Sequence, residues 1–196
     1  MSERLESGQV WSDREWCEAL ELAEKILRWG RVPQRNYDAC TVEAVFQCAL
    51  TGNLLDDARM NSGWTKVAAF ATAHREDDNE LYPHTIWDSR VSTSVVSRLD
   101  DLLAADGVDD PRELFPGVGI VPGRGGRRER LELELRWPNV YRRWSGHFAG
   151  SALVKELRDL LNEGEVPHAD ARWARNRVDG NGRWQRTFHG RLLAAG

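Results

Sequence analysis

Apolar residues recur at helical spacing over most of the chain. After a capping box at Ser12 and Glu15, an apolar stripe runs as far as Gly30, a residue type that commonly closes a helix. The pattern predicts an amphipathic helix between Ser12 and Gly30, because one apolar face lets a surface helix pack on a core. The stripe consists of Trp16, Leu20, Ala23 and Leu27.

Further helices are predicted from the same periodicity and from residues that start and stop helices. One of them follows Asp88, carries its apolar residues on one face and ends at Gly107. That face consists of Val91, Val95, Leu99 and Leu102. Helices are also expected over residues 38–50 and 54–60, from 64 onward after a turn at 61–63, over about 139–161, and near the carboxyl terminus.

One stretch departs from helical spacing. Residues 117–126 are rich in glycine, and Leu131, Leu133 and Leu135 then alternate with charged residues, which is the period of a strand. We therefore expect a mainly α fold with a short β-hairpin inserted at about residues 117–137. The chain is long enough to bury a core, and we expect a single domain over residues 1–196 with a basic Gly/Arg-rich loop at 122–130.

Composition is that of a globular protein in a reducing compartment. Hydrophobic residues make up 41% and charged residues 30% of the chain. No apolar run is long enough to span a bilayer, and residues 1–6 do not resemble a signal peptide. The three cysteines show no CxxC spacing. These features predict a cytoplasmic protein with free thiols and no membrane partner.

Charge is distributed unevenly along the chain. Residues 1–122 carry 12 basic and 22 acidic side chains, whereas residues 123–196 carry 15 basic and 9 acidic ones. A basic segment rich in Arg and Trp fits a phosphate-bearing partner. The same asymmetry also fits a solvated surface with no partner, so charge alone leaves both interpretations open.

Lysine is rare, and one lysine stands in a chemically suggestive place. Of the 27 basic residues, only Lys25, Lys66 and Lys155 are lysine. Lys66 opens an apolar helix, and Asp88 opens the next one. A lysine can act as a nucleophile when it is desolvated, and a carboxylate at a helix N-terminus can stabilise a developing oxocarbenium ion. The simpler interpretation is that Asp88 is only a helix cap and Lys66 a solvated residue.

The sequences Thr65-Lys66-Val67-Ala68 and Ile86-Trp87-Asp88-Ser89-Arg90-Val91 together resemble the helix-hairpin-helix superfamily of DNA glycosylases, most closely the 8-oxoguanine DNA glycosylases. The resemblance implies that Lys66 is the nucleophile, that Asp88 is the catalytic carboxylate and that Phe70 borders the base pocket. It implies no metal and no organic cofactor. The two glycines that usually precede the lysine in this family are replaced by Ser62 and Trp64, with Gly63 between them.

A glycosylase extrudes its target base and holds it against aromatic side chains, and several residues are candidates for contact with DNA. Base-pocket candidates are Phe70, Trp87, Tyr141, Trp144 and Phe188, with Trp184 as a further aromatic. Contacts to the DNA backbone are expected from the turn Ser62, Gly63 and Trp64, from Arg90, and from Arg124, Arg127 and Arg128 in the basic loop.

Two rival functions remain open from the residues alone. A metal-dependent nuclease could use the cluster of His74, Asp77, Asp78, His84 and Asp88, although no motif such as HExxH is present. A non-catalytic DNA-binding module could use the turn and the basic loop without any chemistry. A helical interaction protein is the remaining alternative.

The preferred hypothesis is a monomeric, cytoplasmic, nucleoid-associated DNA glycosylase that acts on double-stranded DNA. The excised base would be 8-oxoguanine or another modified base, including the hypermodified bases of phage DNA. If Lys66 attacks the sugar, the enzyme would also be an abasic-site lyase. If Lys66 only positions water or DNA, it would be monofunctional.

Overall fold

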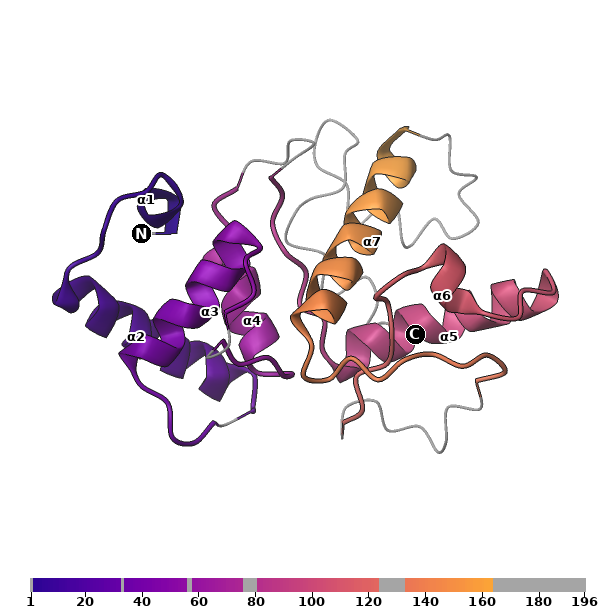
Figure 1. The fold of residues 1–196 in the computed structure, drawn as a ribbon, viewed down its shortest axis with the longest axis horizontal. Coiled ribbons are helices and arrows are strands. Elements are labelled where there is room, and N and C mark those ends of the chain that lie inside the picture. Colours follow the sequence, from indigo (N-terminus) through magenta and orange to yellow (C-terminus); the bar gives the residue numbers. More distant parts are fainter. Residues whose placement is uncertain (1, 33, 56–57, 76–80, 124–132, 164–196) are drawn as a thin grey trace.

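The computed structural model describes residues 2–32, 34–55, 58–75, 81–123 and 133–163 of the chain. These residues are mainly helical, as the apolar spacing predicts (Figure 1). The helices are α1 (Ser2–Glu6), α2 (Asp13–Trp29), α3 (Ala39–Thr51), α4 (Trp64–Ala71), α5 (Ser89–Ala105), α6 (Pro111–Leu114) and α7 (Trp144–Glu163).

Side-chain caps start α2, α3 and α5 where the sequence predicts, whereas α7 begins at Trp144, five residues later than predicted. Ser12 and Glu15 form both hydrogen bonds of the capping box at the start of α2. Asp38 caps α3 by accepting a hydrogen bond from the Thr41 amide at 2.9 Å. Gly52 ends α3 in the left-handed conformation, with φ of 73°, where a side chain would be strained. The predicted helix bounds are therefore confirmed to within a residue or two for α2, α3 and α5.

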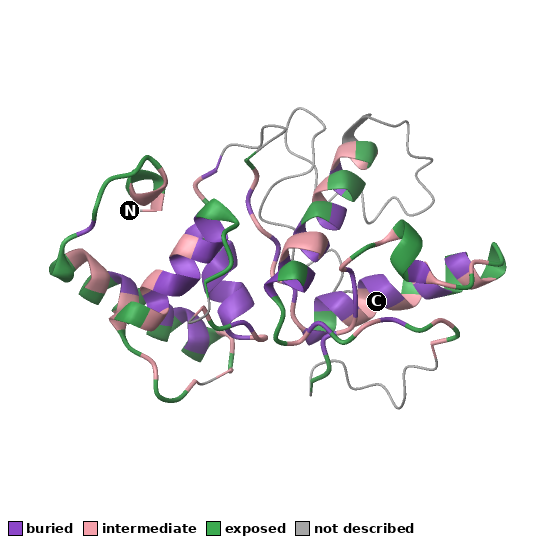
Figure 2. Ribbon diagram, in the orientation of Figure 1, coloured by how far each residue is buried: buried purple, intermediate pink, exposed green. Residues whose placement is uncertain are grey.

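The buried apolar residues form two separate clusters (Figure 2). The first core is built by α2, α3 and α4, and the second by α5, the segment before α7 and the middle of α7. The start of α7 joins the two, because Trp144 packs in the first core while Leu153 and Val154 pack in the second. Helices α4 and α5, which follow each other in sequence, thus belong to different cores.

The predicted helix over 54–60 is wrong for the described part of that segment, 54–55 and 58–60. Within it the Ala58 amide donates to the Leu55 carbonyl at 3.0 Å, but other backbone groups bond to distant partners. The Leu55 amide donates to the Cys48 thiol at 3.2 Å, and the Ala58 carbonyl accepts from the Trp144 indole at 3.0 Å. Leu54 remains 66% exposed, whereas Met60 is buried in the first core.

The predicted β-hairpin is also wrong, because no strand forms in the described residues 117–123 and 133–137. Only an isolated bridge joins Ile120 to Asn139. The carboxylate of Asp100, buried within α5, accepts hydrogen bonds from the amides of Glu134 and Leu135 at 2.7 and 3.0 Å. The amides that a partner strand would have used are therefore taken by a side chain.

None of the helices in the described ranges is long and apolar enough to cross a membrane.

Candidate active site

Lys66 and Asp88 form an ion pair where the two cores meet. Their Nζ and Oδ2 atoms lie 2.8 Å apart. Lys66 lies in α4, on the first core, and Asp88 is the N-cap of α5, on the second. Only 8% of the Lys66 side chain and 17% of the Asp88 side chain are exposed. The structure therefore brings together the two residues for which the sequence predicts chemistry.

Asp88 divides its two oxygens between the helix and the lysine. Oδ1 accepts hydrogen bonds from the amides of Arg90 and Val91 at 3.0 and 3.2 Å, and Oδ2 accepts from Lys66. The positive end of the α5 dipole adds to the stabilisation of a negative charge there. Asp88 is thus both a helix cap and an ion-pair partner.

The Lys66 amine is fixed by a backbone carbonyl and by a glycine. Nζ also donates to the carbonyl of Ser62 at 2.7 Å. A Cβ atom at Gly30 would lie only 2.5 Å from Cδ of Lys66, so the lysine stem occupies the place of a side chain at the end of α2. Sequence reasoning assigned Gly30 only to helix termination, since a contact between residues this far apart leaves no local pattern.

Thr65 and Trp87, the residues just before Lys66 and Asp88, hold the two helix starts together. The Trp87 amide donates to Oγ1 of Thr65 at 2.9 Å, and Thr65 is completely buried. The same hydroxyl lies 2.9 Å from Nδ1 of His147 in α7. One hydroxyl oxygen therefore connects α4, the start of α5 and α7.

A buried chain of polar groups extends from Thr65 through two histidines. Nε2 of His147 lies 3.2 Å from Nδ1 of His84, whose Nε2 lies 3.3 Å from the guanidinium of Arg75. Burial lowers the pKa of His147 to about 3. Burial, and then the charges of His147 and Arg75, hold the pKa of His84 well below its ordinary value.

The donor and acceptor of each bond in this chain follow from these neighbours. An arginine can only donate, so His84 accepts through Nε2 and carries its proton on Nδ1. His84 then donates to Nε2 of His147, whose Nδ1 proton is donated to Thr65. Two neutral histidines thus form a single chain of hydrogen bonds that ends at the Thr65 hydroxyl, beside the Lys66–Asp88 pair.

The turn before Lys66 is closed by Asn61. Its Oδ1 atom accepts hydrogen bonds from the amides of Gly63 and Trp64 at 2.7 and 3.2 Å. These are two of the three turn residues predicted to contact DNA, and the Trp64 side chain is completely buried. A phosphate could use these amides only by displacing the Asn61 side chain, whereas the partly exposed Ser62 is accessible from the surface.

The aromatic residues predicted to form a base pocket do not gather in one place. Phe70 is 49% exposed and makes an edge contact with Trp29, the last residue of α2. Trp87 is buried in the second core and Trp144 in the first. Tyr141 packs at the edge of the second core. Phe70 is the one candidate with both exposure and proximity in sequence to Lys66.

Other predicted contacts are only partly within the described residues. Arg90 is exposed in the first turn of α5, beside Asp88. Arg124, Arg127, Arg128, Trp184 and Phe188 lie outside the described ranges.

The metal-binding alternative receives no support from the described residues, which contain no group of three or more potential ligands. Both ring nitrogens of His84 are engaged by Arg75 and His147. Those of His74 contact the Ala71 carbonyl and Glu6. Asp77 and Asp78 lie outside the described ranges.

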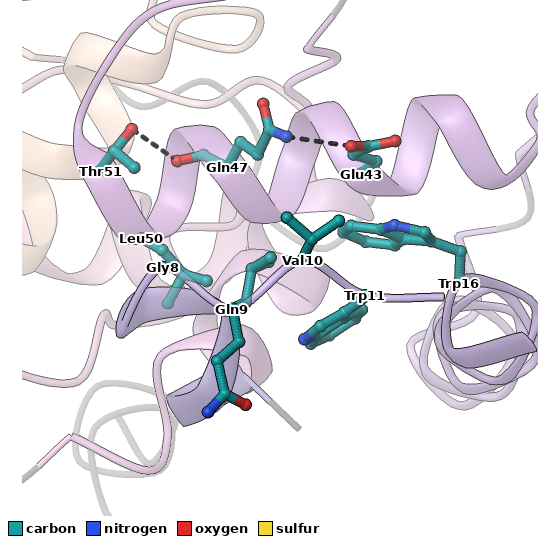
Figure 3. A pocket seen from close by; sticks show the side chains of 10 residues that line it. Gly8, Gln9, Val10, Trp11, Trp16, Glu43, Gln47, Leu50 and Thr51 are labelled. Atoms are coloured by element: carbon teal, nitrogen blue, oxygen red, sulfur yellow. Dashed lines mark hydrogen bonds between the residues drawn. The ribbon is translucent and has the colours of Figure 1, made fainter. Parts of the chain in front are cut away.

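A pocket of about 310 Å³ lies elsewhere, between the segment after α1 and helix α3 (Figure 3). Trp11 and Trp16 form part of its wall, with ring centroids 4.4 Å apart. None of its lining residues belongs to the Lys66–Asp88 site. They are Leu5, Gly8, Gln9, Val10, Trp11, Trp16, Glu43, Gln47, Leu50 and Thr51.

Comparison with known proteins yields no match to a family profile, to a curated protein or to a solved structure.

Proposed function

We propose that this protein is a DNA glycosylase of the helix-hairpin-helix type that excises a modified base and then cleaves the abasic site. The observation that carries the proposal is the ion pair between Lys66 and Asp88, at 2.8 Å, in the local sequences that resemble those enzymes. The exposed Phe70 and Arg90 beside the pair supply surface for a base and a phosphate.

Stability alone does not account for such a pair. Removing two charges from water costs about as much as their attraction returns, so a buried ion pair is often no more stable than an apolar one. This pair also joins helix α4 of the first core to the start of helix α5 in the second core. Gly30 and Thr65 hold the pair in position. Two charges that distant parts of the fold hold in position in this way support a functional site.

The two residues supply the chemistry of base excision. Lys66 transfers a proton to Asp88, which is within hydrogen-bond reach, and the free amine attacks C1′ of the sugar as the bond from C1′ to the base breaks. The departing base takes the bonding electrons and that proton, and the carboxylate of Asp88 then faces the cationic sugar. The C1′–Nζ adduct opens to a Schiff base as the bond from C1′ to the ring oxygen breaks and that oxygen takes a proton from Nζ. Loss of a C2′ proton to water, with departure of the 3′ phosphate, then cleaves the strand by β-elimination.

A base-release assay with a matched pair of lysine variants tests this function. Duplexes that contain 8-oxoguanine, uracil, an alkylated base or a glucosylated base would be incubated with the wild type, Lys66→Ala and Lys155→Ala. We expect release of one of these bases by the wild type and a loss on the order of 10³-fold or more in Lys66→Ala. Lys155→Ala is the control, because Lys155 forms its ion pair within α7.

Three outcomes are decisive. Base release lost only in Lys66→Ala supports the proposal. Equal loss in both variants contradicts the assignment of Lys66. If the wild type binds every duplex but releases no base, the protein is a DNA-binding module and the glycosylase proposal is wrong.

A further inference from the structure

A basic and aromatic surface lies at the end of α2, next to the Lys66 site. No acidic residue occurs between Glu24 and Asp38, although acidic residues outnumber basic ones in this half of the chain. Lys25, Arg28 and Trp29 are all exposed, and their spacing of three and four residues puts them on one face of the helix. Together with Arg31 and Phe70 they form what we term the α2 surface.

The α2 surface is anchored to the active pair through neighbouring residues. Trp29 is 65% exposed and its ring meets that of Phe70 edge-on, with centroids 6.1 Å apart. Trp29 adjoins Gly30, against which the Lys66 stem packs, and Phe70 lies one turn beyond Lys66 on α4. Two exposed aromatic rings therefore lie beside the residues that hold the proposed nucleophile.

The positive charges of this surface are not used within the described part of the chain. No ion pair between described residues involves Lys25, Arg28 or Arg31. Arg14, on the same helix, does have such a partner in Glu18 at 3.0 Å. Positive side chains next to exposed aromatic rings supply the chemistry of contact with unstacked nucleotides.

Arg31 occupies a position where glycine is the usual residue. Its φ of 54° is left-handed, and the hydrogen bonds from Arg31 N to the Arg28 carbonyl and from Val32 N to the Leu27 carbonyl form a Schellman motif. A side chain is strained in that conformation. The arginine here lowers stability relative to glycine while it adds an exposed charge to the surface.

We propose that the α2 surface binds unpaired nucleotides of the DNA strand at the Lys66 site. Trp29 and Phe70 stack on bases, while Lys25, Arg28 and Arg31 contact phosphates. The proposal rests on the function proposed above and adds a DNA contact in the acidic half of the chain to those expected from the Gly/Arg-rich loop.

Equilibrium binding of a short fluorescein-labelled single-stranded DNA tests the α2 surface without any catalysis. We expect Trp29→Ala to weaken binding about tenfold, the effect of one lost stacking contact. We expect Arg28→Gln and Arg31→Gly each to lower the slope of log affinity against log salt by about 0.7, the effect of one lost phosphate contact. Arg14→Gln, at the far end of α2, is the control for a lost positive charge and should leave the slope unchanged.

Arg31→Gly separates binding from stability. Because glycine relieves the left-handed strain, this variant should raise the midpoint of thermal unfolding by about 2–4 °C while it weakens binding. A more stable protein with weaker DNA binding supports the inference, and unchanged binding in both Arg31→Gly and Trp29→Ala overturns it. If the wild type releases a base while these variants bind DNA normally, the inference about the α2 surface is wrong and the proposed function stands. If the wild type binds no DNA at all, both proposals fail.

Discussion

Among the described residues, two lysine–aspartate ion pairs have similar length but different origin. Lys155 and Asp159 lie 2.7 Å apart, four residues apart on the single helix α7. Lys66 and Asp88 lie 2.8 Å apart, 22 residues apart, and belong to helices in different cores. The first pair needs only helical spacing. The second exists only if both cores form and meet correctly, which is the degree of positioning that catalysis requires.

The surroundings of the two pairs differ in the same way. Asp159 also accepts a hydrogen bond from its neighbour Arg158; burial would raise the pKa of Asp159, but the hydrogen bonds from Lys155 and Arg158 lower it. Around Lys66, by contrast, Asp88 and Gly30 come from other parts of the fold, while the Ser62 carbonyl lies four residues away. An ion pair within one helix, such as Lys155–Asp159, contributes little to stability. Changes to the two pairs should therefore have very different effects.

Next to the loss expected from Lys66→Ala, the largest effect is expected from Asp88→Asn. Asparagine is also a good N-cap, so α5 should still begin at the same residue, but the negative charge opposite the sugar is lost. We expect base release to fall about 10²–10³-fold, the usual effect of removing one group that stabilises charge in a transition state. Single-turnover rates measure this. Asp159→Asn should be as active as the wild type, and a comparable loss there would argue against the comparison of the two pairs.

A smaller loss of base release is expected from Gly30→Ala, which displaces the Lys66 side chain but leaves the lysine itself in place. The backbone at Gly30 (φ −71°, ψ −5°) accepts alanine, but the new methyl would lie 2.5 Å from Cδ of Lys66. Because displacement by about 1 Å can lower rates about 10²-fold, we expect a loss of about 10–100-fold.

The control for Gly30→Ala is Gly52→Ala. Gly52 is left-handed with open space around it, so alanine should destabilise the fold without reaching the site. Equal activity losses in the two variants would mean that stability, rather than the position of Lys66, determines the rate.

Thr65→Val should lower base release about tenfold, because the Trp87 amide would lose its acceptor while side-chain volume is kept. Thr65→Ser, which retains the hydroxyl, should recover most of the rate. Ser92→Ala is a matched control, since Ser92 is also buried and accepts from the Val121 amide, but in the second core. A rate loss in Ser92→Ala as large as in Thr65→Val would show that any buried hydroxyl matters equally.

The smallest effect concerns stability in mild acid. Burial depresses the pKa of His147 to about 3 from 6.5, so below pH 6.5 the unfolded chain binds a proton that the folded chain does not. The contribution of His147 to the free energy of unfolding is thus fully present above that pH and is lost as the pH falls, by about 1 kcal/mol from pH 6.5 to 5.5. Urea unfolding at both pH values would measure this. In His147→Gln, the free energy of unfolding should change less between the two pH values. The same change as in the wild type would exclude His147 as the group responsible.

The helices were predictable where their start and stop residues act locally. Ser12, Asp38 and Asp88 cap helices with their own side chains, so the signal lies within a few residues of sequence. The prediction failed at 117–137, where the buried carboxylate of Asp100 takes backbone amides 34 and 35 residues away. The spacing of apolar residues within the segment does not show that a distant carboxylate binds its backbone amides.

The candidate site was predictable only in part. Lys66 and Asp88 were identified by resemblance to a family, whereas Gly30, Thr65 and His147 act through contacts between distant segments. The bond between Thr65 and His147 spans 82 residues. Trp29 was missed because a tryptophan at the end of an amphipathic helix is usually part of the core, and here it is exposed.

The most direct test is to map a borohydride-trapped adduct. The wild type would be incubated with the DNA that it cleaves, reduced, digested and analysed by mass spectrometry for the modified residue. Because the chain has only three lysines, Lys25, Lys66 and Lys155, the assignment is unambiguous. We predict that the sugar is attached to Lys66. Attachment to Lys25, to Lys155 or to the terminal amine, or base release without any adduct, would contradict the role of Lys66 as the nucleophile.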